Sequence, residues 1–257
     1  MRMENGKSHS FRIRQKLGAV GLLAMGLLSS CGGGSSTDSS GGGSKTVTYG
    51  ALSDIRDGAS YKTVTIGTQT WMAENLNYRN TTGSKDTFGT CYKLSADSCA
   101  KYGRLYTWME AIDTGADFDD VTIKVTLPRQ GICPTGWHVP SDTEWGTLVA
   151  FVGADDARIK LSSTTGWSTT ICSIMGWKCS GTDDYGFRVL PGGGTDAADF
   201  LDTTVFIGAG TNGDFLSATQ TGGFYMWERG FSSTALTTVS RYAVYKSWRW
   251  SLRCLKN

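Results

Sequence analysis

Histidine is nearly missing from this 257-residue sequence, and only His138 lies beyond the first thirty residues. A single histidine excludes most acid–base arrangements that need two, and no Cys-x-x-Cys pair is present to build a zinc site. The glycine run at 192–194 lacks the lysine and the following helix of a phosphate loop, and no nucleophile elbow occurs. The sequence therefore predicts no cofactor, no metal centre of the usual kinds and no enzyme.

A basic block is also missing once the N-terminus is set aside. Residues 1–30 hold five of the basic residues and one acidic residue, which leaves 20 basic and 22 acidic residues in the remainder. A chain with this balance lacks the block of positive charge that would bind a phosphate backbone. We therefore expect no nucleic-acid partner.

The first apolar run, Leu17 to Leu28, is too short to span a bilayer. It follows a basic segment ending at Lys16, so residues 1–30 are interpreted as a signal peptide. The run ends in Leu28-Ser29-Ser30-Cys31, which resembles the lipobox of bacterial lipoproteins. That resemblance implies cleavage before Cys31 and acylation of this cysteine. The alternative is ordinary cleavage that leaves Cys31 as a free thiol.

The segment that follows, within residues 31–50, is rich in glycine and serine and cannot bury a core. Lipoproteins commonly carry a flexible tether at this place, which favours the acylated form of Cys31. We therefore expect a lipid-anchored protein of the bacterial cell envelope, held in the outer membrane by the acyl chains.

The stretch from Cys133 to Trp145 organises the remaining residues, 51–257. Ser141, with Glu144 three residues later, forms a capping box that predicts the start of a helix. Trp145 begins an apolar face at helical spacing, and Gly153 suits the end of the helix. We interpret Trp145, and Trp137 before it, as core residues rather than as ligand-stacking residues.

Other segments predict short strands. Residues 61–66 and 69–72 flank a Gly-Thr turn and predict a hairpin. Residues 248–254 alternate between apolar and basic residues, which predicts a last strand with an apolar and a basic face. A second capping box, Thr107 with Glu110, predicts another short helix. The pattern indicates a single compact α+β domain with many short antiparallel strands and two short helices.

Six cysteines remain when Cys31 is set aside, and an even number in an exported chain favours disulfides. Cys91 and Cys99 enclose a short local loop, and so do Cys172 and Cys179. These two natural pairs leave Cys133 to join Cys254.

Several motifs also match a known family in order: residues 54–58, 61–78, 102–108, 131–145, 181–191 and 251–254. Together they closely resemble the Fibrobacter succinogenes major paralogous domain. The resemblance implies exported bacterial proteins, often lipoproteins, and no established activity. The 137–145 run and the Gly-Phe-Arg segment at 186–188 are also similar to the group of folds that includes C-type lectins and the formylglycine-generating enzyme.

Two functions remain open. The first is a non-catalytic surface binding module for an extracellular polysaccharide, because tryptophan and tyrosine can stack on sugar faces while carboxylates bind hydroxyl groups. The second is a scaffold of the cell envelope that contacts other envelope proteins and has no small ligand. Acidic residues predicted to crowd between the later strands are the candidate ligand contacts, and they could also hold a calcium ion. They are Asp183, Asp184, Asp196, Asp199, Asp202 and Asp214.

Overall fold

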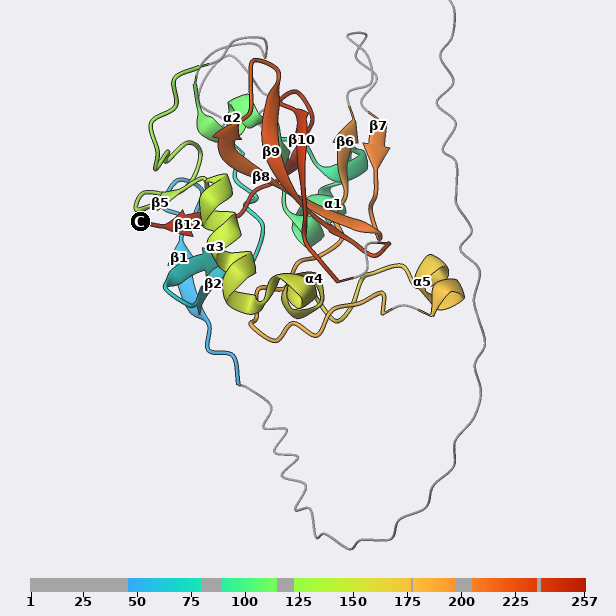
Figure 1. Cartoon of the computed structure of the whole chain (residues 1–257). Coiled ribbons are helices and arrows are strands. Elements are labelled where there is room, and N and C mark those ends of the chain that lie inside the picture. The colour runs from blue at the N-terminus through green and yellow to red at the C-terminus, as the bar shows by residue number, and fades with distance from the viewer. Residues whose placement is uncertain (1–45, 80–88, 115–122, 177, 197–204, 235–236) are drawn as a thin grey trace, which may run out of the picture. The chain divides into compact units, whose positions relative to one another are not determined.

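Short segments rich in β-branched and aromatic residues pair into two five-stranded sheets and one two-stranded sheet. The computed structural model describes residues 46–79, 89–114, 123–176, 178–196, 205–234 and 237–257. Within these residues nearly all strand pairs are antiparallel, which confirms the expected α+β domain of short strands (Figure 1).

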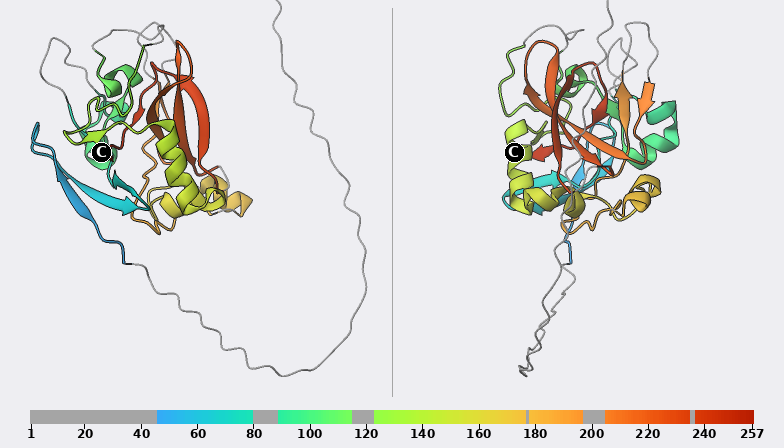
Figure 2. Two further views of the ribbon diagram at one scale, coloured as in Figure 1. Left: turned by 60° about the vertical axis from the view of Figure 1, so that its left-hand side comes forward. Right: turned by 45° about the vertical axis from the view of Figure 1, so that its right-hand side comes forward.

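The first sheet joins the start of the domain to its end. Its order is β1 (Gly50–Ser53), β2 (Ser60–Ile66), β3 (Gln69–Met72), β12 (Leu255–Lys256) and β5 (Trp137–His138). The predicted hairpin is confirmed as β2 and β3, with Val64 opposite Trp71. Gly67 in its turn has a φ of +61°, a conformation that favours glycine. Figure 2 shows β1 and β2 as a long twisted ribbon extending from one side of the domain.

The second sheet is built mainly from the last third of the chain. Its order is β10 (Ser240–Tyr245), β9 (Tyr225–Ser232), β8 (Asn212–Gln220), β11 (Trp250–Ser251) and β4 (Leu105–Tyr106). Strand β11 runs parallel to β8, with Ser251 opposite Phe215. A separate pair, β6 (Gly194–Asp196) and β7 (Val205–Ile207), lies beside this sheet in Figure 1.

Both predicted capping boxes are confirmed. Helix α3 (Asp142–Val152) begins after Ser141, whose backbone N–H donates to Glu144 Oε2 at 2.8 Å. Helix α2 (Trp108–Ile112) begins after Thr107, whose backbone N–H donates to Glu110 Oε2 at 2.8 Å. In each case the glutamate binds a backbone donor that the first helical turn leaves without a partner.

The prediction of only two short helices was wrong. The part of the chain that the structure describes also contains three further α-helices and two 3₁₀ turns: α1 (Ala96–Tyr102), α4 (Ala157–Leu161), α5 (Thr170–Met175), η1 (Tyr92–Leu94) and η2 (Ala154–Asp156). Elements this short show no clear helical period and are not stable in isolation. Disulfides and packing within the domain hold them, and these long-range constraints are not visible in a local pattern.

The interpretation of Trp137 and Trp145 as core residues is confirmed, since both are buried. Trp145 lies at the centre of one of two apolar clusters, with its ring 4.7 Å from that of Trp71 and 5.4 Å from that of Phe215. Trp137 belongs to the other cluster, together with Cys133 and Cys254. The tryptophan-lined turn therefore delivers α3 onto the core.

The last segment differs from the predicted two-faced strand. Residues 248–254 do not form one strand, because β11 joins the second sheet and β12 joins the first. Arg253 between them is only 1% exposed. It donates to Asn75 Oδ1 at 2.8 Å, to Arg188 O at 2.9 Å and also to Phe187 O. Burial lowers the pKa of Arg253 to about 9.

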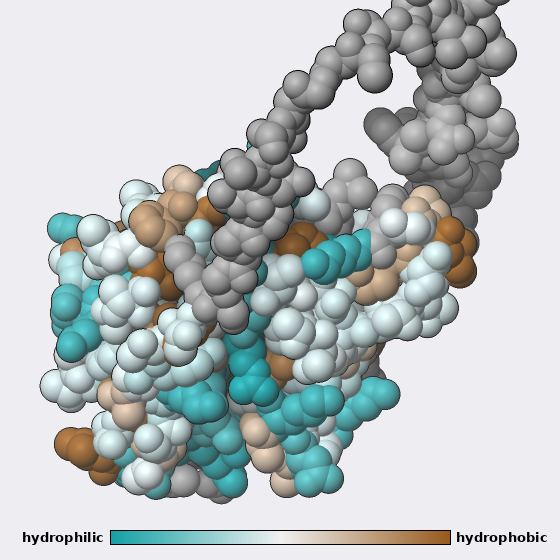
Figure 3. Space-filling view, turned by 90° about the horizontal axis from the view of Figure 1, so that it is seen from below, coloured by the Kyte–Doolittle hydropathy of each residue, from teal (hydrophilic) through white to brown (hydrophobic). Residues whose placement is uncertain are grey.

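The described residues contain three disulfides, which join Cys91 to Cys99, Cys133 to Cys254 and Cys172 to Cys179. The second of them spans 121 residues and connects the segment before β5 with the segment before β12. In the described part of the chain, no helix combines the length and apolar character needed to cross a membrane. The underside of the domain in Figure 3 is mostly hydrophilic, with scattered hydrophobic residues.

Candidate functional site

The predicted acidic contacts that lie within the described residues do not form one group. Asp183 lies in a loop, where its Oδ1 accepts from the backbone N–H of Arg188 at 2.8 Å, and burial raises its pKa. Asp184 is exposed, and the backbone of Asp196 belongs to β6. Asp199 and Asp202, like Cys31, lie outside the described residues. In the parts of the chain that the structure describes, no three acidic, histidine or cysteine side chains gather as a metal site would require.

Asp214 is the one predicted residue that enters a cavity, and its position differs from the prediction. It lies within β8 rather than between strands, and it is 6% exposed. Its partner is Glu228 of β9, which is 4% exposed, and the two carboxyl groups are hydrogen-bonded to each other. Asp214 pairs with Gly230 and Glu228 pairs with Leu216, so the alternation of the strands places both acids on one face.

The absence of a side chain at Gly230 leaves the space in which these two carboxyl groups meet. A Cβ atom at this position would lie 2.8 Å from Glu228 Oε1 and 3.2 Å from Asp214 Oδ1, and closer still to Ser240 Oγ. Any side chain at position 230 would push at least one of these groups away. The acid pair therefore depends on glycine in the neighbouring strand.

The two carboxyl groups share protons near neutral pH. Burial raises the pKa of Asp214 to about 7. Burial and the charge of Asp214 together raise the pKa of Glu228 well above its usual range, although nearby Arg229 opposes this. Two carboxylates in contact cannot both ionise without a large cost. The pair is consequently neutral while both carboxyl groups are protonated, and it carries a single negative charge once the first proton leaves near pH 7.

The acid pair borders a cavity of about 690 Å³ on this face of the second sheet. Three strands supply its floor and the segment after β10 supplies its aromatic wall. The lining residues are Asn212, Asp214, Glu228, Ser232, Thr234, Ser240, Tyr242, Ala243, Val244, Trp248 and Trp250. Polar groups gather toward one end, because Asn212 pairs with Ser232 in the register and both belong to the same face as the acids.

A row of aromatic side chains leads away from the cavity. The ring centroids of Trp250 and Trp248 are 5.9 Å apart, those of Trp248 and Tyr245 are 5.6 Å apart, and those of Tyr245 and Tyr225 are 4.8 Å apart. Tyr225 and Tyr245 are 37% and 44% exposed, and Tyr242 at the cavity is 63% exposed. By the alternation of β9 and β10, Tyr225 and Tyr245 belong to the face of Trp227 and Arg229, whereas Tyr242 and Trp248 line the cavity.

One polar group of the cavity wall has no partner. Trp250 is 4% exposed, and its indole N–H has no hydrogen-bond acceptor among the residues that the structure describes. A buried donor without an acceptor costs about 1–3 kcal/mol. An acceptor supplied by a bound molecule would remove that cost.

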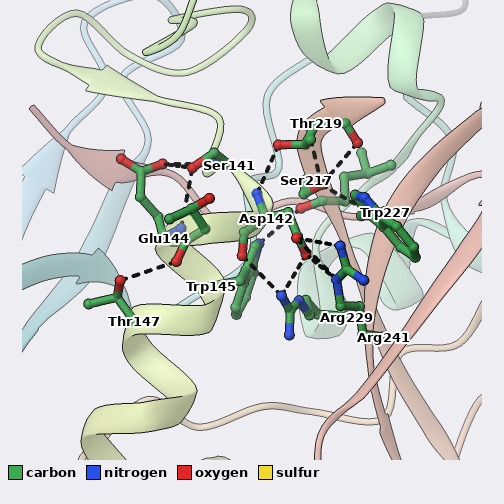
Figure 4. Close-up of polar contacts among 12 residues, drawn as sticks. Ser141, Asp142, Glu144, Trp145, Thr147, Ser217, Thr219, Trp227, Arg229 and Arg241 are labelled. Atoms are coloured by element: carbon green, nitrogen blue, oxygen red, sulfur yellow. Dashed lines mark hydrogen bonds and ion pairs between the residues drawn. The ribbon is translucent and has the colours of Figure 1, made fainter. Parts of the chain in front are cut away.

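The opposite face of the sheet is fixed by ion pairs at the start of α3 (Figure 4). Asp142 accepts from Arg229 of β9 at 2.5 Å and from Arg241 of β10 at 2.8 Å. The Arg241 guanidinium also lies 3.3 Å from the centroid of the Trp227 ring. Although burial alone would raise the pKa of Asp142, its hydrogen bonds to the two arginines lower it. This network holds β9 and β10 in place behind the cavity.

His138 is not among the residues that line the cavity. Its Nδ1 lies 2.7 Å from Asn257 Oδ1 and its Nε2 lies 3.0 Å from Glu144 Oε1. Burial would lower the pKa of His138, but hydrogen bonds to Glu144 and Asn257 raise it. The imidazole therefore ties the capping box of α3 to the end of the chain.

Sequence reasoning missed most of the cavity. Nothing in the sequence around Glu228 shows that its side chain meets that of Asp214 beside Gly230. Trp248 and Tyr242 belong to patterns that usually mean core packing or solvent exposure. The available signal was one acidic residue in each of two neighbouring strands, Asp214 in β8 and Glu228 in β9, and it gained meaning only from the strand register.

Comparison with known proteins gives the family. The sequence model described as Fibrobacter succinogenes major domain matches residues 64–256, which is well over half of the chain. No curated protein and no solved structure is similar enough to this chain to count as a match. The matched region contains both sheets except for β1 and the start of β2. The chain belongs to the Fibrobacter succinogenes major domain family.

Proposed function

We propose that this domain is a non-catalytic binding module that takes an extracellular glycan in the cavity of the second sheet. The observation that carries the proposal is the aromatic wall that Tyr242 and Trp248 give to a cavity of about 690 Å³. Such a wall can stack against a sugar ring, because each sugar has an apolar face. The volume is in the range of small-ligand sites, roughly 300–1,000 Å³.

The polar residues of the cavity suit hydroxyl groups. Asp214, Glu228 and Asn212 offer carboxyl and amide oxygens that accept from sugar hydroxyls. The Trp250 indole N–H offers a donor that a ring or hydroxyl oxygen would accept. Aromatic faces with a few convergent polar groups are the usual composition of a small-molecule site. The resemblance to C-type lectin folds is in line with this proposal.

The spacing of the acids favours binding over hydrolysis. Glycoside hydrolases keep their two carboxyl groups roughly 5 Å or more apart, so that the scissile bond fits between them. In this cavity the carboxyl groups of Asp214 and Glu228 contact each other directly. That arrangement leaves no space for a glycosidic bond between acid and nucleophile, so we assign the pair to recognition.

A glycan array followed by calorimetry tests the binding proposal. The purified protein is expected to retain at least one class of polysaccharide, and Trp248→Ala is expected to weaken that binding at least about tenfold, since stacked aromatic contacts dominate such sites. Phe151→Ala is the matched control, because Phe151 is exposed on α3 and lies outside the cavity. Absence of binding to every glycan would contradict the proposal and leave a scaffold of the cell envelope.

We also propose that the protein is an outer-membrane lipoprotein, acylated at Cys31 after removal of residues 1–30. The lipobox and the glycine- and serine-rich segment after it support this proposal. Cys31→Ala should move the protein from the membrane fraction to the soluble fraction, whereas Ser35→Ala in the tether should not. Membrane retention of the Cys31→Ala protein would contradict the anchor.

A further inference from the structure

No cation among the described residues balances the negative charge of the acid pair. Among those residues, no ion pair includes Asp214 or Glu228. Arg229 is adjacent to Glu228 in sequence, but its guanidinium binds Asp142 on the other face of the sheet. A neutral sugar would satisfy hydrogen bonds in the cavity and would leave the negative charge without compensation. The occupant that fits best therefore carries a positive charge.

The walls of the cavity indicate what kind of cation this is. Tyr242, Trp248 and Trp250 line the same space as the acids. Aromatic faces attract an organic ammonium group, and they offer nothing to the coordination sphere of a hard metal ion. The indole N–H of Trp250 has no acceptor among the described residues, so a ligand with an acceptor atom would complement it. An ammonium group on a hydroxylated ring satisfies the acids, the ring faces and the indole together.

We propose that the cavity selects glycans that carry a free, protonated amino group, with the ammonium held by Asp214 and Glu228 against the aromatic wall. This inference rests on the proposed glycan-binding function and specifies its ligand class. Gly230 is needed for this arrangement. The two carboxyl groups can reach the same donor because position 230 has no side chain between them. The ammonium donates to both acids, and the sugar ring that carries it lies against Trp248 and Tyr242.

Calorimetry at neutral pH with two matched probes tests the inference. The first probe is an oligosaccharide of glucosamine with free amines, and the second is its fully N-acetylated counterpart of equal length. The amine form is expected to bind at least about tenfold more tightly, because acetylation removes the charge and keeps the ring. This comparison uses the unmodified protein and needs no variant.

Variants assign the preference to the acids. Glu228→Gln and Asp214→Asn each remove one carboxyl with little change of shape, and each should reduce amine affinity to that of the acetylated probe. Asp184→Asn is the control, because it removes an exposed acid outside the cavity. Melting curves confirm that each variant is folded, and either of the two acid variants is sufficient for the test.

The outcomes separate the two proposals. Equal affinity for the two probes would overturn the amine preference and leave the glycan-binding function intact. Binding of neither probe, with other glycans retained on an array, would overturn the amine preference alone. An empty array would remove both proposals. Calcium binding that is lost in Glu228→Gln, without any amine preference, would identify a metal site and also overturn the inference.

Discussion

Replacement of Arg253 by methionine should destabilise the domain strongly, although the substitution removes a buried charge. Methionine keeps much of the apolar volume between Phe187 and Phe215, whose ring centroids lie 4.5 and 5.4 Å from the guanidinium carbon. It cannot donate to Asn75 Oδ1, Phe187 O or Arg188 O. The substitution therefore isolates the polar contribution of Arg253.

The expected magnitude follows from those acceptors. Each buried acceptor left without a donor costs about 1–3 kcal/mol. The substitution also removes the desolvation cost of burying the guanidinium, which offsets part of this loss of stability. We therefore expect Arg253→Met to lower the free energy of unfolding by about 3–5 kcal/mol, against about 5–15 kcal/mol for a typical domain. An exposed arginine on a basic strand face, as the sequence alone suggested, would contribute less than about 1 kcal/mol.

Urea denaturation of the oxidised protein, followed by tryptophan fluorescence, measures this difference. Lys256→Met is the matched control, because it removes the same charge three residues away at an exposed position. A loss of less than about 1 kcal/mol in Arg253→Met would refute the account of Arg253 as a buried donor that satisfies three acceptors.

Three further predictions concern the acid pair and the disulfides. Because the pKa values of Asp214 and Glu228 are raised on folding, their contribution to stability is present below about pH 4 and is lost as the pH rises through about 7. Urea midpoints should thus be lower at pH 8 than at pH 5, and Glu228→Gln should reduce the difference; an unchanged difference would contradict the pairing. Gly230→Ala should lower the melting temperature by several degrees through displacement of the acids. Gly222→Ala should leave the melting temperature unchanged, because open space surrounds Gly222. Equal effects of the two substitutions would refute the steric argument. Replacing Cys133 and Cys254 by serine should cost about 4–5 kcal/mol, compared with about 2–3 kcal/mol for the short Cys91–Cys99 loop, and the reverse order would contradict the chain-entropy explanation.

The elements that the sequence predicted correctly are those with a local cause. The capping boxes at Ser141 and Thr107 and the Gly67 turn each depend on residues within four positions of one another. The pairing of the cysteines followed from short loops and from elimination. For the capping boxes, the turn and the two short disulfide loops, the physical reason is contained in a short stretch of chain, so a pattern of residue types is enough to show it; the Cys133–Cys254 bridge was left by elimination.

The elements that the sequence did not predict have causes far away in the chain. Arg253 alternates like a residue on an exposed face, but it is buried because β11 and β12 belong to different sheets. Asp214 was assigned to a loop, and its role depends on Glu228 and Gly230 of the neighbouring strand. Register and sheet order decide such contacts, and neither can be read from local periodicity.

The most direct test of the account is a titration followed by ¹H–¹⁵N spectra of the tryptophan indole groups, assigned with single Trp→Phe variants. On addition of the glycan found by the array, the indole signals of Trp248 and Trp250 should shift together and with the same affinity. The signals of Trp71 and Trp145, which are fully buried in the other apolar cluster, should stay in place. Saturable binding that leaves Trp248 and Trp250 unchanged would contradict the assignment of the cavity as the binding site.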